Sequence, residues 1–142
     1  MREEVKHLAN NFSEVFKSIH QRSYHKMEDK CLYPGQPKLL ILIKDNPGIT
    51  QKDLSERNFV TPASITGMLN KLEASQYLYR EADETDKRIM RVYLTPEGKT
   101  LAEQGEKFLK SMTEQIFLDF TDEELQILVT LTDKMKVNLR KI

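Results

Sequence analysis

The sequence contains one cysteine, Cys31, and no tryptophan. A lone cysteine cannot form a disulfide within the chain, and the first residues do not follow the charged-then-apolar pattern of a secretion leader. A helix that crosses a bilayer needs about 20 apolar residues in a row, and no segment approaches that length. We therefore expect a soluble, cytoplasmic protein with no membrane partner.

An excess of charge of one sign is also missing, because 22 lysine and arginine residues balance 22 aspartate and glutamate residues. No overall field draws such a chain to nucleic acid, so binding of that kind must come from locally placed charges. The sequence also lacks a glycine-rich phosphate loop, an H-E-x-x-H motif, and a grouped nucleophile, base and orienting acid. We expect neither enzymatic activity nor a cofactor.

The sequence also disfavours a metal site. His20, His25, Glu28 and Cys31 lie close in sequence. Histidines five positions apart, however, are about 140° apart on a helix and do not share a face. No histidine follows His25. We therefore predict no metal site.

The sequence is rich in apolar residues at helical spacing, has no repeats or flexible linkers, and suits one domain of residues 1–142. Thr50 and Thr61-Pro62 are typical helix starts, and Thr121 begins a capping-box pattern. The predicted helices cover residues 3–27, a short buried segment around 39–43, 51–57, 62–74 and 96–118, and a last helix follows Thr121.

Two segments between these helices have the composition of strands. Residues 77–82 and 89–94 are rich in aromatic and branched side chains, and apolar residues alternate with others in the second segment. They predict a hairpin with residues 83–87 as its charged tip. The expected fold class is therefore mainly α with a small β-hairpin wing, an α+β arrangement.

The helices over 51–57 and 62–74, joined by a tight connection, predict a helix-turn-helix. The apolar residues of the second helix share one face, and small or polar residues occupy the other face. This second face consists of Ala63, Ser64, Thr66, Gly67, Asn70 and Lys71. A glycine inside a helix costs about 1 kcal/mol relative to alanine, so Gly67 favours close approach to a DNA groove. An ordinary solvated face is the alternative.

The hairpin tip strengthens the DNA-binding hypothesis. With a helix in the major groove, the neighbouring wing lies near the sugar-phosphate edge or the minor groove. Arg88 is the candidate for a contact there, and Asp86 is placed to fix its guanidinium in one pose. A solvated turn, charged for solubility, is the alternative for the tip.

These residues resemble a known family. The run Asp86-x-Arg88-x-x-x-Val92-x-Leu94-Thr95-x-x-Gly98 resembles the wing signature of the MarR family of winged helix-turn-helix regulators. Ser64-Ile65-Thr66, followed by Leu69, Lys71, Leu72, Glu73 and Arg80, is similar to that family's recognition helix and first wing strand. The resemblance extends over nearly the whole chain.

The resemblance implies a homodimer that acts as a repressor by binding a pseudo-palindromic operator in double-stranded DNA. It also implies that a small aromatic or phenolic effector releases the protein from this operator. It implies a DNA-binding lobe at residues 34–98 and a helical dimerisation region at 1–33 and 99–142. The expected DNA-binding residues are Thr61, Ala63, Ser64, Thr66, Gly67, Asn70, Lys71, Asp86, Lys87 and Arg88. The expected ligand pocket is lined by Phe12, Tyr24, Cys31 and Tyr33.

Three positions depart from the family pattern. Gln76 replaces the glycine usual after the recognition helix, so a left-handed backbone there would be strained by about 1 kcal/mol or more. Asn58 stands near the position of a turn glycine and is expected to supply an unusual backbone conformation instead. Gly67 replaces a long side chain, so the family's base contacts do not transfer to this sequence.

Two other functions stay open at the level of sequence. A winged-helix module that binds protein agrees with the zero net charge. The second alternative is a redox-sensing regulator that acts through Cys31. Basic residues beside this cysteine would favour the thiolate form of its side chain.

Overall fold

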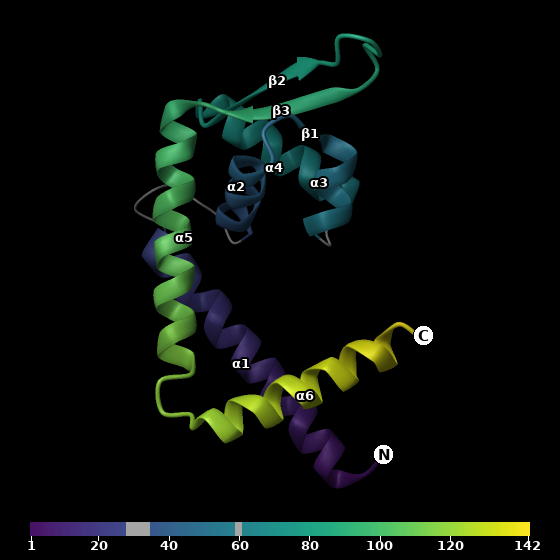
Figure 1. Ribbon diagram of the computed structural model, residues 1–142, viewed down its shortest axis with the longest axis vertical. Coiled ribbons are helices and arrows are strands. Elements are labelled where there is room, and N and C mark those ends of the chain that lie inside the picture. The colour runs from purple at the N-terminus through teal and green to yellow at the C-terminus, as the bar shows by residue number, and fades with distance from the viewer. Residues whose placement is uncertain (28–34, 59–60) are drawn as a thin grey trace. The chain divides into compact units, whose positions relative to one another are not determined.

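The computed structural model describes residues 1–27, 35–58 and 61–142, and it describes the side chains of residues 1–22, 35–58 and 61–142. The described chain forms two compact units, Met1–Lys107 and Phe108–Ile142. Figure 1 labels the elements in chain order. They are α1 (Glu3–Met27), α2 (Gln36–Asp45), β1 (Ile49–Thr50), α3 (Gln51–Asn58), α4 (Pro62–Ala74), β2 (Leu78–Ala82), β3 (Met90–Leu94), α5 (Pro96–Ile116) and α6 (Asp122–Leu139).

The predicted fold class is confirmed, since the chain is mainly helical and contains a small antiparallel sheet with a hairpin. The capping box at the start of α6 is also present: Thr121 Oγ1 accepts from the Glu124 amide at 3.2 Å, and the Thr121 amide donates to Glu124 Oε2 at 2.9 Å. At the start of α3, Thr50 Oγ1 accepts from the Asp53 amide at 3.1 Å. These caps satisfy amides that have no partner within a helix.

The sheet has the strand order β1-β3-β2, and all neighbours are antiparallel. In the hairpin Arg80 lies opposite Val92 and Tyr79 opposite Tyr93, whose rings stack with centroids 5.4 Å apart. The third strand, β1, was not predicted from the sequence, because two residues are too few to show alternation. The loop that joins β2 to β3 extends beyond the sheet (Figure 1).

A compact core joins α2, α3 and α4 to the sheet and to the first turns of α5. It is built from fully or almost fully buried side chains: Leu39, Leu40, Ile43, Leu54, Ile65, Leu69, Leu72, Leu78, Val92, Leu101 and Ala102. In α4 the buried residues lie at spacings of four and three, so one side of the helix is buried and the other is exposed.

The sequence-based expectation for Asn58 is wrong. Asn58 is the last helical residue of α3, is 9% exposed, and does not have a positive φ. The expectation for Gln76 is confirmed, since its φ is 61°, in the left-handed region. Gln76 turns the chain after the end of α4 and allows the Tyr77 amide to donate to Leu72 O at 2.9 Å. This is the hydrogen bond that a glycine usually makes possible after a helix.

The start of α5 is joined to this left-handed turn. Thr95 Oγ1 donates to Gln76 O at 2.7 Å and accepts from the Gly98 amide at 3.1 Å. A Cβ on Gly98 would lie 1.8 Å from the Tyr77 carbonyl oxygen, so only glycine fits there. The turn after α4, at Gln76 and Tyr77, is therefore packed closely against the first turn of α5.

We expect Gln76→Gly to raise the free energy of unfolding by about 0.5–1 kcal/mol, because glycine adopts a positive φ without the Cβ clash. Chemical denaturation of both proteins measures the difference. Ala74→Gly, two residues earlier and still helical, is the control and should lower stability by about 1 kcal/mol. Equal destabilisation by the two glycines would contradict a strained residue at position 76.

Candidate nucleic-acid interface

The first turn of α4 is fixed by a threonine cap. Thr61 has φ −65° and ψ 150°, and its Oγ1 accepts from the Ser64 amide at 3.2 Å and donates to Ser64 Oγ at 2.9 Å. Pro62 follows in the first helical turn, where its missing N–H has no cost. Both polar functions of the Thr61 hydroxyl therefore stabilise the start of the helix.

The predicted recognition face is exposed along α4. Ile65, Leu69 and Leu72 are buried on the opposite side. The exposed residues include every α4 residue expected to contact DNA: Ala63, Ser64, Thr66, Gly67, Asn70 and Lys71. A Cβ placed on Gly67 would have no heavy atom within 4 Å. Within the part of the chain that the structure describes, no packing therefore requires a glycine at this position.

Thr66 is exposed but also takes part in fixing the two helices. Its hydroxyl donates to Pro62 O at 3.0 Å and lies 3.4 Å from Gln51 Nε2, which donates to it from the start of α3. This contact connects the two helices of the helix-turn-helix at their exposed edge.

Arg80 on β2 is a residue that the list of candidates missed. Its Nε and Nη2 donate to the two carboxylate oxygens of Glu73 at 3.0 and 2.9 Å, and Nη2 also donates to Asn70 Oδ1 at 2.8 Å. The hydrogen bonds of this pair lower the pKa of Glu73 and raise that of Arg80. The side chain of Arg80 is 18% exposed and that of Glu73 is 39% exposed, so β2 and α4 are joined by a partly shielded ion pair.

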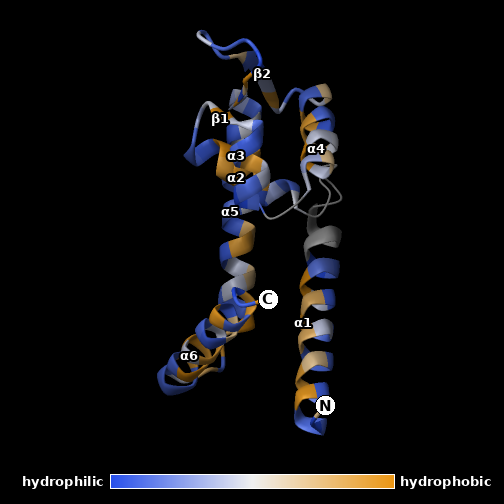
Figure 2. Ribbon diagram, turned by 90° about the vertical axis from the view of Figure 1, so that its right-hand side faces the viewer, coloured by the Kyte–Doolittle hydropathy of each residue, from blue (hydrophilic) through white to orange (hydrophobic). Residues whose placement is uncertain are grey.

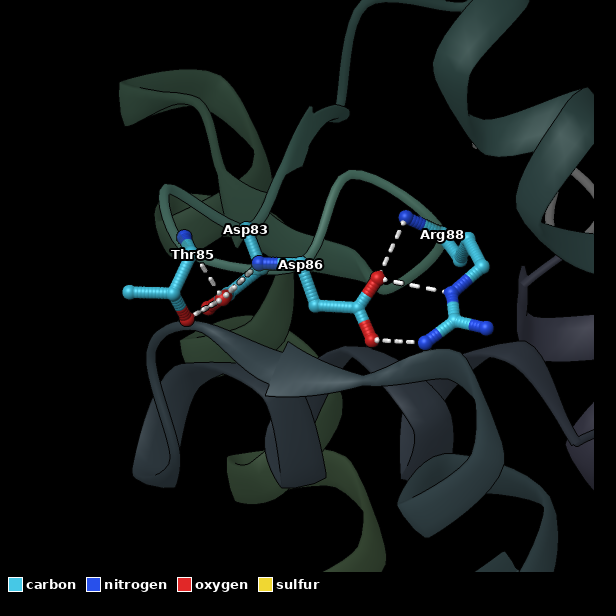
Figure 3. Close-up of polar contacts among 4 residues, drawn as sticks. All are labelled: Asp83, Thr85, Asp86 and Arg88. Atoms are coloured by element: carbon cyan, nitrogen blue, oxygen red, sulfur yellow. Dashed lines mark hydrogen bonds and ion pairs between the residues drawn. The ribbon is translucent and has the colours of Figure 1, made fainter.

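The hairpin tip is ordered by nested side-chain hydrogen bonds (Figure 3). Asp83 Oδ2 accepts from the Thr85 hydroxyl at 2.7 Å and from the amides of Thr85 and Asp86, each at 3.1 Å. Such bonds from a side chain to amides two and three residues later are typical of a tight turn. They hold the pKa of the Asp83 carboxyl well below its usual range.

Asp86 and Arg88 form the pair that the sequence analysis expected at the tip. One Asp86 oxygen accepts from the Arg88 amide at 3.1 Å and from Arg88 Nε at 3.0 Å, and the other accepts from Nη2 at 3.0 Å (Figure 3). These bonds lower the pKa of Asp86 and raise that of Arg88. The Arg88 side chain is nevertheless 90% exposed, so its guanidinium is oriented while it remains accessible.

Arg91 on β3 is a second residue that was missed. Its Nε donates to Asp83 Oδ1 at 2.6 Å and its Nη1 donates to Gly48 O at 2.9 Å. One arginine therefore joins the base of the tip to the loop before β1. No local pattern in the sequence indicates Arg91, because Gly48 is 43 residues away.

A shallow groove of about 560 Å³ lies between the start of α3 and the wing. It is lined by Thr50, Gln51, Lys52, Arg88, Ile89 and Met90. Lys52 and Arg88 therefore line one depression together with the apolar wing residues Ile89 and Met90. Two cations so placed favour an anionic backbone along this edge.

Of the four residues expected to line the ligand pocket, only Phe12 has a described side chain. Phe12 lies in α1, is partly exposed, and stacks on Phe16 with ring centroids 6.2 Å apart. The side chain of Tyr24, as well as Cys31 and Tyr33, lies outside the described residues. The pocket and the proposed thiol sensor therefore remain predictions.

Comparison with known proteins assigns this geometry to a family. Residues 32–90 match the model of the MarR family. The transcriptional regulator HosA of Escherichia coli O157:H7 is 31% identical over 122 residues, which are 86% of this chain and 89% of HosA. The chain belongs to the MarR family. MarR-family proteins are transcriptional regulators and not enzymes, so the expectation of a non-enzymatic protein is confirmed.

Two further relatives extend the comparison. The HTH-type transcriptional regulator SarZ of Staphylococcus epidermidis RP62A is 33% identical over 93 residues, which are 64% of this chain and 60% of SarZ. The crystal structure of Streptococcus pneumoniae FabT in complex with DNA has a TM-score of 0.85 at 21% identity and covers 96% of this chain and 98% of FabT. At that identity the likeness concerns the fold alone. Among the described helices, none combines the length and the apolar character needed to cross a membrane.

Asp83→Asn should lower the free energy of unfolding at pH 7, because it removes the carboxylate that orders the tip and pairs with Arg91. The pKa of Asp83 is lowered in the folded state, so its stabilisation is complete above the unfolded value of about 3.9 and is lost as the pH falls below it. Urea unfolding from pH 7 to pH 2 should show the difference from wild type shrinking below about pH 4.

Glu84→Gln, at the exposed neighbouring position, is the matched control and should change stability little. A deficit of Asp83→Asn that is as large at pH 2 as at pH 7 would contradict this role of the carboxylate.

Proposed function

We propose that the protein is a sequence-specific, dimeric DNA-binding transcriptional repressor. Two features together carry this proposal. The face of α4 is exposed and has no side chain at Gly67, and the wing tip carries an arginine, Arg88, that is both oriented and exposed. A helix with small exposed side chains can enter a major groove closely, and a neighbouring hairpin then reaches the backbone or the minor groove.

The wing supports this proposal through the order of its tip. A guanidinium that is already oriented loses less conformational entropy when it binds a phosphate or a narrow minor groove. Asp86 supplies this orientation without burying Arg88. Lys87, between them, is exposed and adds a second positive charge.

Dimer formation is supported by the terminal helices, each taken by itself. The described part of α1 exposes Leu8, Val15 and Phe16 at 51%, 49% and 65%, and α6 has no buried residue. Figure 2 shows orange, hydrophobic residues along both helices. The exposed apolar residues of α6 are Ile127, Val129, Leu131, Met135, Val137 and Leu139. A two-fold partner that buries such surface also places two recognition helices about one DNA turn, ~34 Å, apart.

The relatives support the same function. SarZ and HosA are named as transcriptional regulators, and FabT, with the same fold, is described in complex with DNA. We extend this role to the present chain, in the cytoplasm, with release from the operator by a small aromatic or phenolic effector. A protein-binding winged helix is the competing function, since the net charge is zero.

Selection of bound duplexes from a random pool, at two salt concentrations, tests the proposal. We expect a palindrome with half-sites one turn apart, and an affinity that falls steeply with salt because several phosphate contacts release counterions. Sedimentation at low micromolar concentration should show a dimer. No enriched sequence, or binding that salt does not weaken, would favour the protein-binding function.

Gly67→Ala should raise the free energy of unfolding by up to about 1 kcal/mol, because alanine favours the helix and its methyl group meets no neighbour. The same methyl group would occupy the closest point of approach to DNA, so we expect about tenfold weaker binding to the selected operator. Thermal unfolding and fluorescence anisotropy measure the two effects.

Thr100→Ala is the matched control, since it also raises helix propensity at an exposed position but lies in α5. It should leave DNA affinity unchanged. Unchanged affinity in Gly67→Ala as well would mean that α4 does not approach DNA through this face.

A further inference from the structure

Arg80 lies behind the exposed face of α4 and contacts Asn70, one of the residues of that face expected to bind DNA. Its Nη2 donates to Asn70 Oδ1 at 2.8 Å. Glu73 accepts from Nε and Nη2 with both carboxylate oxygens, at 3.0 and 2.9 Å. Two parallel bonds from one carboxylate fix the plane of a guanidinium, so Arg80 is held in one pose against Asn70.

The chemistry of the two side chains settles which way the Asn70 amide faces. Arginine has only donors, whereas an asparagine amide has an acceptor oxygen and a donor nitrogen. The oxygen must therefore be the atom that faces Arg80, and Nδ2 is directed away from it. Because Asn70 is exposed, its donor group is the one left for an outside partner.

We propose that Arg80 is a positioning residue for DNA reading, which sets the direction of the Asn70 amide so that Nδ2 donates to guanine in the major groove. This inference rests on the proposed DNA-binding function. Guanine presents two acceptors, O6 and N7, side by side in that groove, whereas adenine presents an acceptor and a donor. An asparagine that reads adenine turns its oxygen and nitrogen toward the base together, whereas here the oxygen faces Arg80.

A purely structural role is the competing explanation, since the same arginine joins β2 to α4 through Glu73. The two roles differ in what they change. Loss of a structural link weakens binding to all sequences, whereas loss of a positioning residue changes the preferred base at one position in each half-site.

The experiment is selection from a random duplex pool with wild-type protein, Asn70→Ala, Arg80→Met and the double variant. We expect wild type to enrich guanine at one position per half-site, and Asn70→Ala to lose about tenfold discrimination at that position alone. In Arg80→Met the preference should move from guanine toward adenine, because the amide can turn. The double variant should behave like Asn70→Ala.

Arg80→Gln is the second variant, for use if Arg80→Met does not fold. Glutamine both donates and accepts, so it no longer imposes one direction on Asn70, and the same shift toward adenine is expected. An even loss of affinity for all sequences, or an unchanged guanine preference in the Arg80 variant, would overturn the inference while the DNA-binding function stands. If wild type enriches no sequence, the proposed function fails, and this inference fails with it.

Discussion

The position of the wing relative to α4 depends on one close backbone contact. The first turn of α5 passes so near Tyr77, in the turn between α4 and β2, that a Cβ on Gly98 would lie 1.8 Å from Tyr77 O. Thr95 uses both polar functions of its hydroxyl at this crossing, toward Gln76 O and the Gly98 amide. Since β2 begins and β3 ends within a few residues of this contact, the hairpin starts from a fixed point. A strained residue, Gln76, is the cost of that geometry.

Beyond that point, the direction of the hairpin is fixed by arginine–carboxylate pairs. Arg80 joins β2 to α4, Arg91 joins the tip to the loop before β1, and Arg88 is oriented within the tip itself. Each of these arginines has a carboxylate partner, so the wing is organised by charge without becoming strongly basic. This pairing reconciles a net charge of zero with a surface suited to DNA: the charges are used locally, to orient donors, and long-range attraction is small.

Local patterns predicted most of the fold, and long-range contacts account for what they did not predict. Helical spacing and threonine caps were sufficient for the helices, and alternation was sufficient for the hairpin. β1 was too short for any pattern, and it forms because Ile49 lies opposite Val92 on a strand far along the chain. The roles of Arg80 and Arg91 were missed for a similar reason, since Arg91 reaches Gly48 across 43 residues. The spacing of apolar residues in α4 predicted correctly which face of the helix is exposed. The same spacing cannot indicate that Arg80, on another element, lies behind that face.

The composition of α4 and of the wing suggests that affinity and specificity are divided between them. Lys71 is the one basic residue of α4, so the helix contributes little of the counterion release on which phosphate binding depends. The small side chains of α4 instead allow close contact with base edges, where the direction of hydrogen-bond donors and acceptors and the fit of the side chains decide the preferred sequence. The wing and the groove beside it carry Lys52, Lys87 and Arg88, which are suited to the backbone. With the proposed roles of these residues, we expect a change of charge on the wing to alter the affinity for DNA, and a change on α4 or at Arg80 to alter the preferred sequence.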